Sequence, residues 1–299
     1  MNNQTPAGAG FVTGRVFANG LHFSYIEMGQ GPLVLALHGF PDTPQTFCYQ
    51  LPALAAAGYW VVAPYTRGYF PTDIPPDGRY EPAALVQDVV ALMAVLSQEP
   101  VILLGHDWGA LAAYGAAVLA PEQVAGLITM ALPPSANIRR AFITNPAQQR
   151  RSWYMYFFQT AYAEMAVEYN NFAFIERLWQ EWSPGWDYSA EEIEALKTSF
   201  RQPGVLSAAL NYYRHIFNPA YHSPELASVR ERLGQPINVP ALYIHGEQDG
   251  CIGLETIEGM ENAFGQGLQK QIIPAAGHFV HREKPEPVNE FILKFLRHQ

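Results

Sequence analysis

The chain has 299 residues, of which 49% are hydrophobic and 15% charged, and its formal net charge is −9. This composition is typical of a globular protein with a large core and argues against a disordered chain. The negative charge, with no compensating basic cluster, argues against nucleic acid as a partner. No apolar run approaches the roughly 18 residues of a transmembrane helix, and the first ten residues do not resemble a secretory signal, so we expect no membrane association.

Apolar runs alternate with helical patterns, which predicts an α/β fold with a mostly parallel sheet. The predicted strands span residues 11–17, 21–28, 32–37, 59–64, 101–104, 124–132, 240–244 and 269–273. The predicted helices of the same region span residues 44–57, 81–98, 111–120 and 285–296. Ala18, Asn19 and Gly20 separate the first two strands and indicate a hairpin, so the sheet should be mixed at one edge. Right-handed crossovers would place helices on both faces of the sheet.

The sequence changes in character after Pro134. From residue 137 to about 221 no strand pattern occurs and aromatic residues are frequent. Helical spacing there fits residues 152–169, 171–182, 190–200 and 203–217. A helical insertion of this length is large enough to form a layer of its own. We therefore predict a first part of an α/β core at residues 1–136, a helical cap at 137–224 and a second part of the core at 225–299.

A predicted strand, a tight turn and a helix follow one another in V-I-L-L-G-H-D-W-G-A, residues 101–110. Gly105 and Gly109 flank the turn, and Asp107 stands where a nucleophile elbow, G-x-S-x-G, has its serine. The turn would raise the carboxylate above the sheet, at the positive end of the next helix. Such an aspartate is either a nucleophile or a simple helix cap, and its partners elsewhere in the chain distinguish the two.

Two later motifs can supply those partners. His278, in G-H-F-V, follows a predicted strand and a small-residue turn, and Asp249, in G-E-Q-D, also follows a strand. The order of nucleophile, acid and histidine is that of the α/β-hydrolase triad. Glu247 is the alternative acid, although its position two residues earlier should direct its side chain elsewhere.

These motifs, together with H-G-F-P at residues 38–41, resemble the α/β-hydrolase superfamily over nearly the whole chain. The aspartate at the elbow is similar to that of the soluble and microsomal epoxide hydrolases and of the related haloalkane dehalogenases. The resemblance implies an α/β-hydrolase fold with an inserted cap, a catalytic triad, and neither a metal nor an organic cofactor. The triad would be Asp107, Asp249 and His278.

The resemblance also assigns the surroundings of the nucleophile. The backbone N–H groups of Phe40 and Trp108 would form an oxyanion hole, and a cis Phe40–Pro41 bond is expected. His38, Pro41 and Met155 are expected at the substrate pocket, with His38 in a structural role. The loop R-G-Y-F-P-T-D at residues 67–73 departs from the family pattern, so the size of the substrate does not carry over.

Two cap segments, R-S-W-Y-M-Y-F-F-Q at 151–159 and L-N-Y-Y-R at 210–214, resemble those that bring tyrosines to an epoxide oxygen. The resemblance assigns this role to Tyr154 and Tyr213, with Tyr156 and Tyr212 as alternatives. Phenols can donate hydrogen bonds and finally a proton to the opening ring. Simple packing in an aromatic-rich cap is the other interpretation.

The predicted function is therefore that of an epoxide hydrolase, a hydrolase acting on ether bonds, which forms a vicinal diol through an ester on Asp107. A haloalkane dehalogenase is one alternative, although Phe40 offers no side-chain donor to a halide. A non-catalytic ligand receptor is the other, although it needs no triad. Two scattered cysteines, Cys48 and Cys251, favour a reducing compartment and hence the cytoplasm. The expected partner is a small epoxide, and the oligomeric state is open, a homodimer included.

Overall fold

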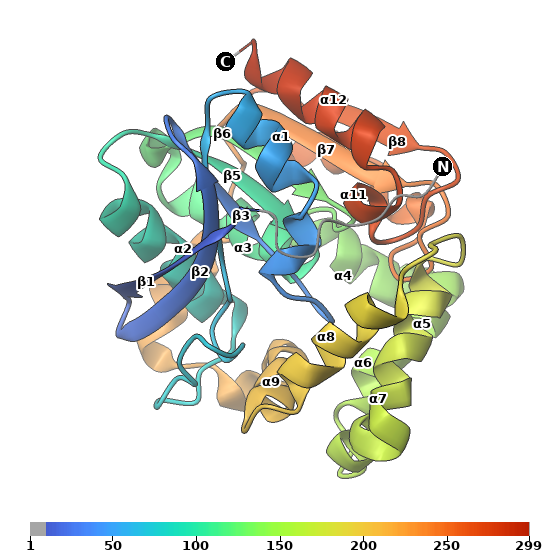
Figure 1. The fold of residues 1–299 in the computed structure, drawn as a ribbon. Helices are drawn as coiled ribbons and strands as arrows, with labels where there is room; N and C mark the ends of the chain where they lie inside the picture. Colours follow the sequence, from blue (N-terminus) through green and yellow to red (C-terminus); the bar gives the residue numbers. More distant parts are fainter. Residues whose placement is uncertain (1–9, 299) are drawn as a thin grey trace.

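The computed structural model describes residues 10–298, which are built around an eight-stranded sheet (Figure 1). The strands are β1 (Val12–Ala18), β2 (Leu21–Gly29), β3 (Leu33–Leu37), β4 (Trp60–Pro64), β5 (Val101–His106), β6 (Val124–Met130), β7 (Ala241–Gly246) and β8 (Gln269–Ile273). Their spatial order is β1-β2-β4-β3-β5-β6-β7-β8. Strand β2 is antiparallel to β1 and β4, and the other neighbours are parallel, so the predicted mixed edge is confirmed.

Helices cover both faces of the sheet, as predicted. The helices that belong to the core are α1 (Gln50–Ala56), α2 (Pro82–Leu96), α3 (Trp108–Leu119), α10 (Ala227–Arg232), α11 (Val280–Glu283) and α12 (Pro285–Leu296). Side chains of β3 alternate between the two faces: Leu35 and Leu37 pack with α2 and α3, whereas Val34 and Ala36 pack with α1 and α12. Burial on both faces explains why β3 is a continuous apolar run.

Short 3-10 helices complete the connections between these elements. They are η1 (Pro44–Phe47), η2 (Pro121–Gln123), η3 (Pro219–Tyr221), η4 (Pro224–Leu226), η5 (Leu254–Ile257) and η6 (Met260–Ala263). The single helix predicted over residues 44–57 is wrong, because the structure has η1 followed by α1. Pro52 has no N–H group and fits an α-helix only in its first turn, so the α-helix cannot start before Gln50.

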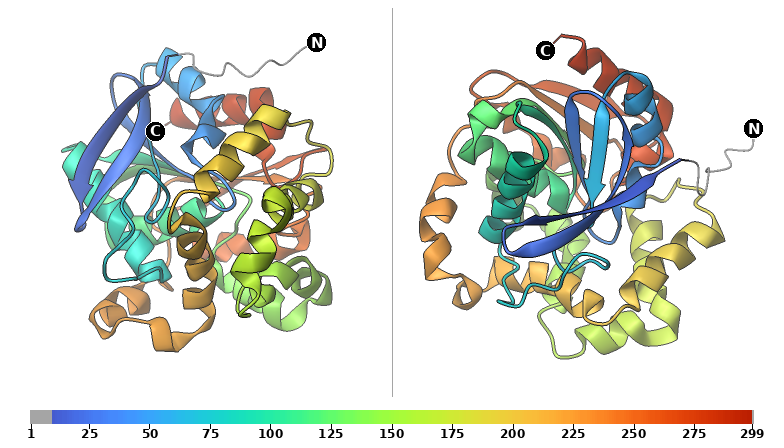
Figure 2. Two further views of the ribbon diagram at one scale, coloured as in Figure 1. Left: turned by 60° about the horizontal axis from the view of Figure 1, so that its bottom comes forward. Right: turned by 60° about the vertical axis from the view of Figure 1, so that its left-hand side comes forward.

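Between β6 and β7 a helical layer gathers beyond one end of the sheet, as the two views of Figure 2 show. Its helices are α4 (Ser135–Thr144), α5 (Pro146–Arg151), α6 (Trp153–Phe157), α7 (Ala163–Trp182), α8 (Ala190–Phe200) and α9 (Val205–Phe217). The sequence did not indicate α4 or α5. The helix predicted over 152–169 is wrong, because a non-helical turn separates α6 from α7.

Helix α7 is interrupted near its middle, where the sequence also predicted a boundary. Asn170, Asn171 and Phe172 follow one another with φ values of 50°, 56° and 57°. This left-handed region costs roughly 1–2 kcal/mol for an ordinary residue, and asparagine tolerates it better than phenylalanine. The break therefore stores backbone strain that the surrounding packing must offset. Within residues 10–298, no helix has both the length and the apolar character needed to cross a membrane.

Candidate active site

Asp107 lies in the tight turn between β5 and α3. Its φ of 52° and ψ of −119° are rare for a residue with a side chain, and such strain of about 1–3 kcal/mol is typical of functional turns. The turn fits only because of its glycines. A Cβ atom at Gly109 would collide with the carbonyl oxygen of Leu37, and one at Gly39 would collide with the Asp107 side chain. The sequence therefore builds an elbow that raises this carboxylate above the sheet.

The two Asp107 carboxylate oxygens have different surroundings. Oδ1 accepts a hydrogen bond of 2.8 Å from the backbone N–H of Phe40, whereas Oδ2 lies 3.8 Å from Nε2 of His278. Burial raises the pKa of the Asp107 carboxyl, while the His278 charge and the N–H groups of Phe40 and Trp108 act to lower it. The two oxygens can therefore have separate roles, one held by N–H donors and the other facing the histidine.

His278 is oriented by Asp249. Nδ1 of His278 lies 2.9 Å from Oδ2 of Asp249, and Oδ1 of Asp249 accepts from the N–H groups of Cys251 and Ile252 at 2.7 and 2.8 Å. The Asp249 carboxylate accepts a hydrogen bond from the Nδ1–H group of His278. A neutral His278 ring therefore has no proton on Nε2, which carries a free lone pair. That atom has no hydrogen-bond partner among the described residues, and it faces Asp107.

The pKa of His278 reflects opposing effects. Burial of the ring lowers it, but the negative charges of Asp249 and Asp107 outweigh burial and raise the pKa above its usual value. The alternative acid, Glu247, is exposed and accepts from the N–H of Ala275, so the structure brings Asp249 and not Glu247 to the histidine.

Two tyrosines of the helical layer lie above Asp107, one from α6 and one from α9. The rings of Tyr154 and Tyr213 are 5.6 Å apart between centroids, and Tyr213 lies 5.2 Å from Phe40. The Tyr213 hydroxyl is buried without a partner among residues 10–298, and that of Tyr154 lies 3.5 Å from Sγ of Cys251. Burial, with the Asp107 charge nearby, raises the pKa of both phenols, so both stay protonated and able to donate.

The two alternative tyrosines are placed differently. Tyr212 donates its hydroxyl to the carbonyl of Arg67 at 2.8 Å, and Tyr156 is 45% exposed with its ring against Phe217. Helical geometry explains the contrast, because neighbours on α9 point about 100° apart. Of the four tyrosines, Tyr154 and Tyr213 are the two whose hydroxyls are both buried and free of a backbone acceptor.

The three residues expected at the pocket all lie close to this group. His38 donates from Nδ1 to the Gly39 carbonyl at 2.9 Å and accepts at Nε2 from the Thr66 N–H at 3.1 Å. Burial lowers its pKa to about 4, so the ring is neutral and structural. The Phe40–Pro41 bond is cis, as expected, and the Pro41 carbonyl accepts a hydrogen bond from the indole N–H of Trp179 on α7. Met155 is buried on α6.

Trp182 and Cys251 belong to the site but were not predicted. The carbonyl of Trp182 accepts the backbone N–H of His278 at 3.0 Å, and its ring lies 4.9 Å from that of Tyr154. Trp182 is the last residue of α7, and Cys251 follows Asp249 by two positions. No local pattern marks either residue, since these contacts join distant parts of the chain.

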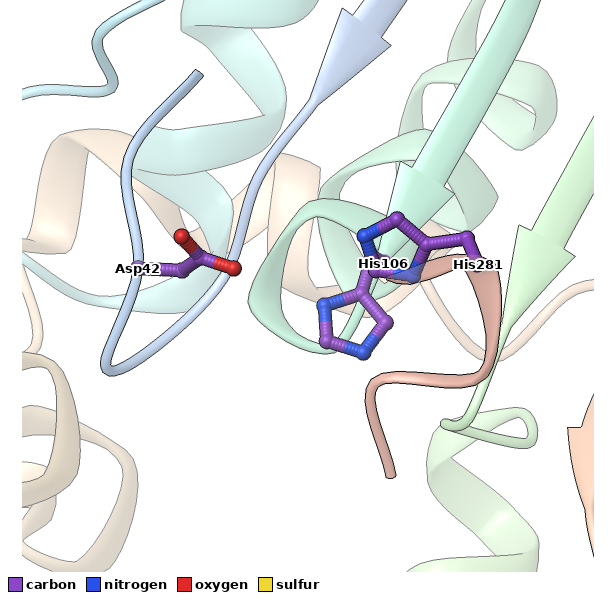
Figure 3. A group of neighbouring side chains, drawn as sticks. All are labelled: Asp42, His106 and His281. Carbon is purple, nitrogen blue, oxygen red and sulfur yellow. The ribbon is translucent and has the colours of Figure 1, made fainter. Parts of the chain in front are cut away.

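A second buried group consists of Asp42, His106 and His281 (Figure 3). One donor atom of each lies within 4.8 Å of the others, and these residue types can bind metals. His106 donates from Nε2 to the His278 carbonyl at 3.0 Å, and Nε2 of His281 shares a 2.6 Å hydrogen bond with Thr46. Burial lowers the pKa of both rings and raises that of Asp42 to about 6. These hydrogen bonds hold the loop that carries His278.

The chain matches the family described as alpha/beta hydrolase fold over residues 32–285. It is 31% identical over 296 residues to epoxide hydrolase 4 of Homo sapiens, an alignment that covers 95% of this chain and 78% of that protein. It is 32% identical to epoxide hydrolase 1 of Caenorhabditis elegans, and this alignment covers 92% of this chain and 67% of that protein.

Solved structures give the same result. An inhibitor complex of an epoxide hydrolase from Bacillus megaterium superposes with a TM-score of 0.82 at 29% identity, covering 95% of this chain and 100% of that one. Epoxide hydrolase A from Mycobacterium thermoresistibile gives a TM-score of 0.81 at 26% identity, and the superposition covers 96% of this chain and 98% of that one. Its sequence and its fold show that the chain belongs to the α/β-hydrolase superfamily and, within it, to the epoxide hydrolase family.

Proposed function

We propose that the protein hydrolyses an epoxide to a vicinal diol through a covalent ester on Asp107. One observation carries the proposal: a buried carboxylate lies between an acid-oriented histidine on one side and two protonated phenols on the other. Those groups match the needs of a reaction in which a carboxylate attacks carbon while an oxygen leaves as an alkoxide. The epoxide hydrolases among its relatives support the same substrate class.

In the first step, Oδ2 of Asp107 attacks a carbon of the epoxide ring and the bond from that carbon to the ring oxygen breaks. Tyr154 and Tyr213 donate hydrogen bonds to the oxygen, and one of them transfers its proton. The product is an ester that joins substrate to protein, with Oδ1 of Asp107 as its carbonyl oxygen. Oδ1 already lies 2.8 Å from the Phe40 N–H, so the carbonyl enters the oxyanion hole without rearrangement.

In the second step, Nε2 of His278 takes a proton from a water molecule whose oxygen attacks the ester carbon of Asp107. The negative charge moves to Oδ1, where the N–H groups of Phe40 and Trp108 stabilise it. The bond from the ester carbon to Oδ2 then breaks, and the diol leaves with Oδ2 and the proton from His278. The proton that remains on the new Asp107 carboxyl passes to the tyrosinate, which restores both the carboxylate and the phenol. Forming the ester removes the Asp107 charge that helps to raise the His278 pKa, which favours the neutral ring that must act as base.

The cap is proposed to close the site. We assign the cap to residues 137–224, between the core segments 1–136 and 225–299, because Tyr154, Tyr213 and Trp182 all come from this insertion. No cofactor takes part in the proposed steps. A cytoplasmic location, suggested by two cysteines that are buried and unpaired, stays a prediction, and so does a homodimer.

A dehalogenase is the second candidate within the same fold. A halide leaves as a stable anion and needs no proton, whereas the paired phenols of Tyr154 and Tyr213 supply one. The side chain of Phe40 offers no donor to a halide. A pure ligand receptor would have no use for the hydrogen bond between Asp249 and His278. The paired tyrosines therefore favour the epoxide.

Replacing the base tests the covalent route. His278→Gln should complete ring opening but not hydrolysis, so the ester accumulates. Intact-protein mass spectrometry after mixing with styrene oxide should show one added substrate mass, which proteolysis assigns to the peptide containing Asp107. The double variant with Asp107→Asn is the control and should show no adduct. Unmodified His278→Gln that retains its fold and binds styrene oxide would count against the ester.

A further inference from the structure

A groove on the helical layer lies between the break in α7 and the turn that joins α8 to α9. Its volume is about 310 Å³, within the range of small-molecule sites. Phe172, Phe200 and Leu206 form an apolar floor, and each of them is largely buried. The rim is polar and carries both signs of charge, and it includes Glu168, Arg201 and Ser207.

The groove matters because the catalytic groups are enclosed. Asp107 is 6% exposed and His278 is 0% exposed, so an epoxide reaches them only through an opening between side chains. Phe200 stands between the groove and the nucleophile. Its ring lies 6.3 Å from that of Phe172 on the groove side and 6.0 Å from that of Phe40 on the inner side. The Phe40 N–H in turn contacts the Asp107 carboxylate.

We propose that this groove is the access route of the substrate and that Phe200 is the side chain that limits substrate size. The inference rests on the proposed function and extends it to selectivity. In this proposal, a turn of the Phe200 ring away from Phe40 opens the groove towards Asp107. The neighbouring backbone can respond, because Asn171 and Phe172 are held in a left-handed conformation that is sparsely populated for residues with side chains.

The chemistry of the groove also indicates a substrate class. An aromatic floor favours an aryl or alkyl group on the epoxide, through apolar burial and ring contacts. The rim charges of Glu168 and Arg201 have opposite signs, so the groove does not select a charged group. The geometry points to an uncharged epoxide with an apolar substituent that passes Phe200.

Two variants test the route from opposite directions. Phe200→Leu shortens the limiting side chain, and it should raise kcat/KM for trans-stilbene oxide about tenfold relative to 1,2-epoxypropane, the scale on which apolar pocket walls discriminate. Ser207→Trp places a large ring in the groove from an exposed position on α9. It should lower kcat/KM for trans-stilbene oxide about tenfold. Ser228→Trp, at an exposed serine of α10 outside the groove, is the matched control and should behave as wild type.

The association rate of trans-stilbene oxide, followed by quenching of tryptophan fluorescence, reports access whether or not chemistry follows. It should fall about tenfold in Ser207→Trp and stay unchanged in Ser228→Trp. If Ser207→Trp binds and reacts like the control, the groove is not the route, even where Phe200→Leu fails to fold. If wild type forms no diol from any epoxide while Ser207→Trp still slows association, the proposed reaction is wrong and the access route stands.

Discussion

Replacing Tyr213 by phenylalanine removes a buried hydroxyl that has no hydrogen-bond partner among the described residues. Its neighbour Tyr212 has an equally buried hydroxyl, which donates to the carbonyl of Arg67 at 2.8 Å. Both residues are buried tyrosines of α9, and they differ in whether the hydroxyl has a hydrogen-bond partner among the described residues. They therefore form a matched pair that separates catalysis from stability.

Tyr213→Phe should keep the fold and lose the reaction. A buried polar group without a partner costs about 1–3 kcal/mol, so the free energy of unfolding should remain level or rise by about 1 kcal/mol. The same hydroxyl is proposed to donate to the oxygen that leaves the epoxide ring. Losing one donor to a developing oxyanion costs on the order of 3 kcal/mol, so ring opening should slow about a hundredfold.

Tyr212→Phe should have the opposite result. It leaves the buried carbonyl of Arg67 without its donor, which should lower the free energy of unfolding by about 1–3 kcal/mol. Ring opening should stay close to the wild-type rate, because this hydroxyl is held by the Arg67 carbonyl.

Both variants are measured by urea denaturation and by single-turnover formation of the ester in a rapid-quench instrument. If Tyr213→Phe opens the ring at the wild-type rate, the phenol is a packing residue. If Tyr212→Phe is the slower enzyme of the two, the assignment of the pair is reversed.

Two further predictions concern the nucleophile and a structural histidine. Asp107→Asn should abolish diol formation in freshly purified protein, because an amide does not form the ester. Its thermal unfolding should stay cooperative. Steady turnover by this variant would mean that Asp107 is not the nucleophile. The pKa of His38 is lowered by burial to about 4, so its contribution to stability is complete above pH 6.5 and is lost as the pH falls from 6.5 towards 4. When the pH falls from 7 to 5, the free energy of unfolding of the wild type should therefore decrease by about 2 kcal/mol more than that of His38→Gln, as measured by urea denaturation. If the two proteins lose stability in parallel, the His38 ring is not held neutral.

Much of the core could be predicted from sequence because its signals are local. Strand β8 and helix α12 have the predicted bounds, since an apolar strand or an amphipathic helix between turn residues is marked by its own side chains. The helix predicted over residues 44–57 is wrong because the helical pattern of side chains continues across Pro52, which an α-helix accepts only in its first turn. The sequence does not indicate the turn between α6 and α7, because aromatic residues occur on both sides of the turn and within it, so the side-chain pattern shows no helix boundary.

The residues of the candidate site also differ in whether a local sequence signal marks them. Asp107, Asp249 and His278 follow strands in short motifs, so their positions could be found before any contact was known. The contact of the Trp182 carbonyl with the His278 N–H could not be predicted, because it joins the end of α7 to the loop after β8. The support that His106 gives to the His278 carbonyl was hidden in the same way, although His106 lies within the elbow motif itself.

The isotopic fate of oxygen in one turnover tests the central proposal most directly. Enzyme in excess over styrene oxide is allowed a single turnover in water enriched in oxygen-18, and both the diol and the peptide containing Asp107 are weighed. An ester intermediate predicts an unlabelled first diol, because its new oxygen comes from Oδ2 of Asp107, and a label in the Asp107 carboxylate. A labelled first diol with an unlabelled Asp107 peptide would mean that water attacks the epoxide directly, and the covalent account would be wrong.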